Sequence, residues 1–326
     1  MCQTENSESN AIPLYNTKIQ ARAGDSATFA FYRFRFHFRA LDRIHFPTGT
    51  SGNVVRGGFG AVLRQSAEPA EYARIFEPGA ALAQSPSGLA DWPRPLVFRA
   101  AHLDGSTFQP ESRFFVDVNV FDLRAPVLGL LRAAFAELGQ CGIGPGRGRA
   151  GLERIEQLDL AGTAREAAET PGEPAIVDLA APPGPVDRLS VRFVTPTELK
   201  ADGRTVSQPE FPALFGRLRD RIATLRALYG AGPLDIDFRA LGERAAAVRL
   251  ARCDLNWERA IRRSGRTGQV HSLGGFTGEA EYEGNLSEFV PWLRAGYWVG
   301  VGRQTVWGKG VLETTILPAG PGKGGE

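Results

Sequence analysis

The sequence predicts an α+β protein made of two tandem units that share one order of strands and helices. Each unit opens with a strand that is followed by a helix. Each closes with a helix, a glycine-rich basic loop and a strand. The chain has 326 residues, about twice the length of a typical domain, which independently suggests two domains.

The composition is that of an ordinary globular protein, with 43% hydrophobic and 23% charged residues. The chain contains no apolar run long enough to span a membrane, and residues 1–10 do not have the basic-then-apolar start of a signal peptide. Its cysteines, Cys2, Cys141 and Cys253, lack the spacing of metal ligands. We therefore expect a cytoplasmic protein with neither a metal site nor a cofactor.

The net charge is only +2, and the kind of cation is more informative. Lysine occurs at positions 18, 200, 309 and 323 alone, and every other basic residue is arginine. A GC-rich genome would give this bias, and so would binding to phosphate, which the arginine fork fits well. The position of the arginines must decide between the two explanations.

The order of elements predicts the ferredoxin-like (RRM-like) fold in each unit. In the first, strands are expected at 29–40, 92–101, 111–121 and 152–160, and helices at 54–65 (capped by Asn53) and 125–138. In the second, strands are expected at 189–194, 249–257 and 276–282 with a last one after 310, and helices at 211–229, 238–248 and 286–295. Arginines 217, 219, 221 and 226 are expected to form a solvated helix face.

The predicted boundaries follow shifts in composition. Residues 1–20 form a flexible leader, 21–160 the N-terminal domain, 188–316 the C-terminal domain with its glycine-rich loop, and 317–326 a tail. The segment 161–187 is rich in Ala, Gly, Pro and Glu and is the expected linker, in which 175–179 favours a short strand.

The strand at 29–40 alternates between an aromatic and a cationic face. The aromatic face carries Tyr32, Phe34, Phe36 and Phe38, and the other face carries Arg33, Arg35, His37 and Arg39. A merely exposed strand face usually mixes charges of both signs. The pattern therefore leaves two interpretations open, a surface that faces an anion and a simple solvent-exposed strand.

Two glycine-rich basic loops follow helices at equivalent places, at 142–151 and at 300–310. Backbone N–H groups in such loops can approach phosphate. The alternative is a tight turn that needs glycine only for positive φ. Because both loops carry basic residues, Arg147 and Arg149 in one and Arg303 and Lys309 in the other, we favour polyanion binding. Gly57, Gly58 and Gly60 in the first helix likewise suggest close approach of another backbone, either a protein strand or a polynucleotide.

At these residues the chain resembles the CRISPR-associated processing endoribonucleases of the RAMP superfamily, which cut precursor CRISPR RNA within its repeats. The resemblance rests on VVRGGFGAVLR at 54–64 and on C-terminal motifs at 263–266, 274–278, 283–286, 289–293 and 300–310. Two departures stand out. The family's cysteine cluster after the first helix is absent, and Trp298 precedes the signature loop where a Leu-His pair is expected.

The resemblance implies metal-independent cleavage of RNA, in which a 2′-hydroxyl attacks the neighbouring phosphorus and leaves a cyclic phosphate and a 5′-hydroxyl. Such a step needs a general base, a general acid and a cation. His45 is the leading candidate because a catalytic histidine of the family lies near the first helix. His37 and Lys309 are the further candidates. His102 is expected to be structural.

RNA contacts are expected along the cationic strand, the first helix, both loops and the basic segment 262–271. The candidates are Arg33, Arg35, Arg39, Arg56, Arg147, Arg149, Arg263, Arg266, His271, Gly300, Gly302, Arg303, Gly308 and Gly310. Tyr297, Trp298 and Trp307 flank the second loop as either base-stacking or core residues. The open sheet faces and the second loop are expected to form a positive cleft.

Three functions remain possible on the sequence alone. The first is the endoribonuclease, which binds CRISPR repeat RNA as a monomer or homodimer and has no membrane partner. The second is a non-catalytic RNA-binding subunit of a CRISPR effector complex. The third is a ferredoxin-like ligand-binding protein without an RNA role, against which the basic loops and the cationic strand argue.

Overall fold

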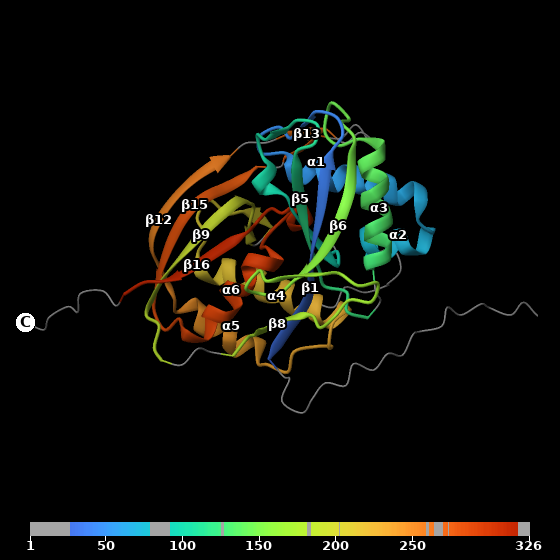
Figure 1. The fold of residues 1–326 in the computed structure, drawn as a ribbon. Coiled ribbons are helices and arrows are strands. Elements are labelled where there is room, and N and C mark those ends of the chain that lie inside the picture. The colour runs from blue at the N-terminus through green and yellow to red at the C-terminus, as the bar shows by residue number, and fades with distance from the viewer. Residues whose placement is uncertain are drawn as a thin grey trace, which may run out of the picture.

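The computed structural model describes residues 27–78, 92–124, 127–180, 184–201, 203–258, 261–263, 270–272 and 274–318. These residues form two antiparallel sheets with their helices (Figure 1). The predicted leader 1–20 and most of the tail 317–326 lie outside the described residues. No helix within the described ranges is long and apolar enough to cross a membrane.

The N-terminal sheet has the strand order β3-β5-β1-β6-β7, with β1 at its centre. Its elements are β1 (Thr28–Ala40), α1 (Ser51–Ser66), α2 (Pro69–Phe76), β3 (Leu96–Arg99), η2 (Ala101–Leu103), β5 (Arg113–Val120), α3 (Leu128–Cys141), β6 (Ala150–Leu158) and β7 (Ala164–Glu166). A small ladder beside it joins β2 (Ile44–His45) to β4 (Thr107–Phe108).

The C-terminal sheet has the strand order β12-β15-β9-β16. Its elements are β9 (Arg188–Thr197), α4 (Phe211–Tyr229), α5 (Phe238–Ala246), β12 (Arg249–Glu258), β15 (Gly275–Glu283), η3 (Ser287–Phe289), α6 (Val290–Val299), η4 (Thr305–Trp307) and β16 (Leu312–Ile316). Two hairpins pair β10 (Lys200–Ala201) with β11 (Arg204–Thr205), and β13 (Ile261–Arg263) with β14 (Val270–Ser272).

Both sheets place the first strand of their unit between the third and the fourth, and the second strand at an edge. This is the antiparallel ferredoxin-like arrangement, so the predicted fold class is confirmed. Aromatic packing explains why β1 takes the centre. Phe34, Phe36 and Phe38 are fully buried on its inner face, and the Phe36 ring lies 4.3 Å from that of Phe135 on α3.

The first residues of β1 bind the two units together. Phe29 and Phe31 lie on the outer face of the strand and are buried in the core of the C-terminal unit. The Phe31 ring lies 5.9 Å from Phe121 and 5.8 Å from Trp298 on α6. The short strand expected within 161–187 is present as β8 (Ala175–Asp178), and it pairs with this same stretch of β1.

We expect Phe31→Ala to lower the free energy of unfolding by about 3–5 kcal/mol, because it removes a fully buried ring shared by both units. Phe36→Ala is the matched control, since that ring is equally buried but lies within the N-terminal core. Thermal unfolding should resolve separate transitions for the two units only in the Phe31 variant. A single cooperative transition in both variants would contradict this role of β1.

Burial corrects two expectations about helices. Arg221 and Arg226 on α4 are not solvated but buried, and each binds a backbone carbonyl. Arg221 donates to Val299 at 2.9 Å, and Arg226 donates to Thr28 at 2.8 Å. Burial lowers the pKa of Arg221 to about 10. Helix α1 starts at Ser51 after Thr50, and Asn53, the expected cap, lies inside it.

Candidate functional site

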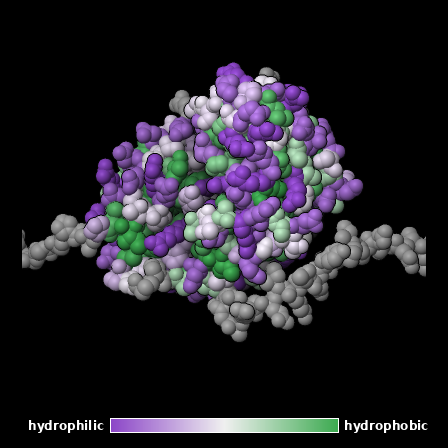
Figure 2. All heavy atoms as spheres, viewed as in Figure 1, coloured by the Kyte–Doolittle hydropathy of each residue, from purple (hydrophilic) through white to green (hydrophobic). Residues whose placement is uncertain are grey.

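A cavity of about 580 Å³ opens between the two units. The start of α1, η2 and the end of β3 form one wall, and β9, the end of α6 and the loop around η4 form the other. In the space-filling view the surface is hollowed between the C-terminal sheet and the N-terminal unit (Figure 2). This cleft is the candidate site.

The C-terminal wall is built by the glycine-rich loop 300–310, which folds back on itself. The N–H of Val301 donates to the carbonyl of Gly310 at 2.8 Å. Gly310 has φ +72°, and a Cβ on it would lie 1.9 Å from the carbonyl oxygen of Val301, so only glycine fits there. The fold-back places Lys309 in the cleft with 9% of its surface exposed. The positive φ of Gly310 and the fold-back of the loop fit the tight-turn interpretation.

Lys309 has unusual electrostatics for a lysine. Burial lowers its pKa from the ordinary value, because the protein around it disfavours the charged ammonium. Glu258 and Asp104 act in the opposite direction and partly offset this effect. An ammonium with a lowered pKa is a better proton donor near neutral pH.

The N-terminal wall is the first turn of α1. The Ser51 N–H donates to the Asp104 carboxylate at 2.9 Å, and the buried Ser51 hydroxyl has no hydrogen-bond partner among the described residues. At Gly52 a Cβ would lie 2.1 Å from the carbonyl oxygen of Trp307, so helix and loop touch backbone to backbone. In the part of the chain that the structure describes, no protein backbone approaches Gly57, Gly58 or Gly60 in this way. The neighbours of Gly58 and Gly60 are side chains, and Gly57 has none within 4 Å.

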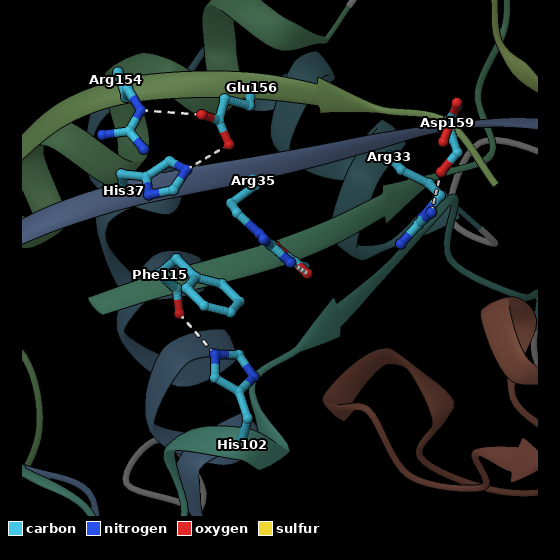
Figure 3. Close-up of polar contacts among 9 residues, drawn as sticks. Arg33, Arg35, His37, His102, Phe115, Arg154, Glu156 and Asp159 are labelled. Atoms are coloured by element: carbon cyan, nitrogen blue, oxygen red, sulfur yellow. Dashed lines mark hydrogen bonds and ion pairs between the residues drawn. The ribbon is translucent and has the colours of Figure 1, made fainter. Parts of the chain in front are cut away.

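His102 on η2, which was expected to be structural, also lines the cleft. Its Nε2 lies 3.0 Å from the carbonyl oxygen of Phe115, and its ring stacks on that of Phe115 at 4.3 Å (Figure 3). Desolvation lowers its pKa. Arg35 and Arg99 lower it further, while the Phe115 carbonyl and Asp117 raise it. No sequence motif marks this residue, since β5 and β3 bring its neighbours together.

The cationic face of β1 is paired with carboxylates from the adjacent strands. Arg35 binds Asp117 at 2.8 Å, and His37 Nε2 lies 2.7 Å from Glu156 (Figure 3). The remaining two cations are also engaged, since Arg33 donates to the carbonyl of Asp159 and Arg39 binds Glu111 at 3.1 Å. Each of the four basic side chains on this face is therefore engaged by an acceptor of the protein.

The cleft itself is mixed in charge, so the expectation of a positive cleft is wrong. Lys309 and Arg99 line it together with the carboxylates of Asp104, Asp117, Glu258 and Glu313. Arg99 is further held by Tyr297, on whose ring its guanidinium lies at 4.5 Å. Asp117, Glu258 and Glu313 lie on strands β5, β12 and β16, and Asp104 follows η2. These elements are far apart in the sequence, so no local pattern predicted that their carboxylates would meet in the cleft.

His45 lies on β2, three residues before Thr48 of the cleft lining. Its Nδ1 is 2.9 Å from the hydroxyl of Thr107, and its side chain is exposed. The first glycine-rich loop lies against it, since a Cβ on Gly144 would be 2.7 Å from the His45 carbonyl oxygen. His45 therefore lies beside the first glycine-rich loop, whereas Lys309 lies in the second.

The other predicted RNA contacts fall into three groups. Arg149 binds Asp42 at 2.8 Å, Arg303 binds Glu198 at 3.0 Å, and Arg147 has φ +49° at the tip of its loop. Arg56 lies over the rings of Phe76 and Trp307. Arg263 and His271 lie on the paired strands β13 and β14, but their side chains, like the whole of Arg266, lie outside the described residues.

Two family models match the two units of the chain. Residues 191–312 match the family model of the CRISPR-associated endoribonuclease Cas6. The C-terminal unit is therefore similar to the Cas6 family over almost its whole length. Residues 29–175 match a second family model, described as an N-terminal domain. The resemblance drawn from the sequence is therefore confirmed.

Solved Cas6 structures share the fold at low identity. A Cas6 product complex has a TM-score of 0.52 at 17% identity, over 90% of this chain and 100% of that chain. Cas6 of Thermus thermophilus has a TM-score of 0.51 at 18% identity, over 89% and 99%. A chain of a partial Cas6-RT-Cas1–Cas2 complex has a TM-score of 0.51 at 15% identity, over 89% of this chain and 46% of that chain. No curated protein sequence matches the chain.

Proposed function

We propose that this protein is a metal-independent endoribonuclease that binds CRISPR repeat RNA and cleaves it in the cleft between its two units. The 2′-hydroxyl of one nucleotide attacks the neighbouring phosphorus, and the products carry a cyclic phosphate and a 5′-hydroxyl. The match of residues 191–312 to the Cas6 family supports the substrate class. We take 21–160 and 188–316 as the two domains that supply the walls of the cleft.

The observation that carries the proposal is the placement of Lys309. The glycine-rich loop holds a nearly buried ammonium opposite the first turn of α1, inside a cavity that both units line. Charge develops on the phosphorane oxygens and on the 5′-oxygen during this reaction. An ammonium in a partly desolvated cleft stabilises that charge more strongly than one in water.

For RNA binding we propose the stretch of β1 that leads into the cleft. Arg33 and Arg35 lie on its outer face, and Arg39 continues the same row. Phosphates would compete with the carboxylates of Asp117 and Glu111, which now hold Arg35 and Arg39, and with the Asp159 carbonyl, which now holds Arg33. Binding should therefore weaken steeply with salt, because each phosphate neutralised by arginine releases counterions.

The test is cleavage of labelled repeat RNA from the genome that encodes the protein, in EDTA. We expect one cut with a cyclic phosphate end, and no cut at that position when its nucleotide carries 2′-deoxyribose. The deoxy substrate should still bind with unchanged affinity, which separates lost chemistry from lost binding. Cleavage of the deoxy RNA, or cleavage that requires a divalent metal, would refute the mechanism. Tight binding without any cleavage would instead indicate a non-catalytic RNA-binding subunit.

A further inference from the structure

His102 is held in one tautomer by the backbone. Its Nε2 lies 3.0 Å from the carbonyl oxygen of Phe115. A carbonyl oxygen only accepts hydrogen bonds, so Nε2 must carry the proton. In the neutral ring the other nitrogen, Nδ1, then has a free lone pair. Figure 3 shows Nδ1 turned away from the Phe115 carbonyl.

The surroundings favour this neutral ring. His102 stacks on Phe115. The charged groups that face it are Asp117 on β5, Arg35 on β1 and Arg99 on β3. Desolvation and the two arginines keep its pKa below the ordinary value, against the opposing effects of the Phe115 carbonyl and Asp117. The ring therefore has a basic nitrogen at neutral pH, which an imidazolium lacks.

The other histidines whose side chains the structure describes are placed less favourably to accept a proton in the cleft. The Nε2 of His37 is engaged by Glu156 at 2.7 Å, and the side chain is only 15% exposed. The Nδ1 of His45 is engaged by the Thr107 hydroxyl at 2.9 Å, outside the lining of the cleft. His102 is accessible and lines the same cavity as Lys309.

We propose that His102 is the general base of the cleavage reaction, with Lys309 as its general acid. This assignment rests on the proposed function. The proposed base therefore lies on η2, the short helix after β3. The family resemblance had instead pointed to His45, which precedes α1. The carbonyl of Phe115 positions the base, because it fixes which nitrogen is free.

The proton balance of the step is complete without a metal. The Nδ1 of His102 takes the proton of the 2′-hydroxyl while the bond between O2′ and phosphorus forms. The bond between phosphorus and O5′ breaks, and the Lys309 ammonium gives a proton to O5′. The products are a cyclic phosphate and a 5′-hydroxyl, and solvent returns both side chains to their starting protonation states.

The test uses His102→Gln in the full chain under single-turnover conditions. The amide nitrogen of glutamine can still donate to the Phe115 carbonyl, but the side chain has no basic atom. We expect cleavage to slow by about 10²–10⁴-fold while the affinity for repeat RNA stays unchanged. In the wild type the rate should rise with pH through the His102 pKa, below the ordinary histidine value. This rise should be absent in the variant.

A second variant guards against a purely structural effect. Imidazole added to His102→Ala should restore part of the rate, which a folding defect would not allow. His45→Gln is measured in parallel as the rival base. The proposal is overturned if His102→Gln cleaves at the wild-type rate, or if it keeps the wild-type pH profile. A wild-type protein that binds RNA without cutting it would contradict the proposed function itself. Failure of the His102 assignment and failure of the proposed function are therefore distinguishable.

Discussion

Replacing Lys309 with alanine is expected to slow RNA cleavage by about 10²–10⁴-fold and to leave RNA affinity nearly unchanged. The ammonium is mostly buried, so it contributes little to general attraction of the RNA backbone. Its lowered pKa makes it a stronger acid than a surface lysine. The wild-type rate should accordingly fall at alkaline pH, as the ammonium loses its proton below the ordinary lysine pKa. Lys309→Ala should lack this fall.

Two controls separate the possible roles of Lys309. Lys200→Ala removes a lysine on β10, away from the cleft lining, and should leave the rate unchanged. Lys309→Arg keeps the charge but donates a proton poorly, because guanidinium remains protonated at all accessible pH values. A Lys309→Arg protein with the full rate would show that the residue supplies charge alone. RNA with a bridging 5′-sulfur, whose leaving group needs no proton, should rescue Lys309→Ala if the residue is the acid.

Gly52→Ala is expected to slow cleavage by about 10²-fold, because it shifts one wall of the cleft against the other. A Cβ at this position would lie 2.1 Å from the carbonyl oxygen of Trp307, which is backbone and cannot rotate away. Either α1 or the glycine-rich loop must then move. We also expect the free energy of unfolding to fall by about 1–3 kcal/mol, measured by denaturant titration.

Gly57→Ala is the matched control for Gly52→Ala. Both residues lie in α1, but a Cβ on Gly57 meets no atom within 4 Å. Alanine is the better helix former, so this variant should gain about 0.5–1 kcal/mol and keep its activity. Equal behaviour of the two variants would show that the contact between α1 and the loop does not support the site.

Local patterns predicted most of the fold. Helix α4 occupies the predicted range 211–229, because its apolar residues recur at helical spacing. Strand β1 follows from strict alternation. The burial of Arg226 on α4 was not predictable, because its guanidinium binds the carbonyl of Thr28, which is distant in the sequence. Helical periodicity predicts which residues share a face of the helix, but it cannot predict a hydrogen-bond acceptor that is distant in the sequence.

The sequence by itself determined the two ferredoxin-like units, the resemblance to the Cas6 family and the choice of Lys309 in its glycine-rich loop as a candidate residue. Each depends on short-range chemistry: alternation, helical spacing and glycine at positive φ. Only the tertiary structure decided which histidine shares the cleft with Lys309 and that carboxylates balance the charge of the cleft. His102 gains its tautomer, its stacking and its charged neighbours from strands that are brought together by long-range pairing. Such pairing leaves no local pattern in the chain.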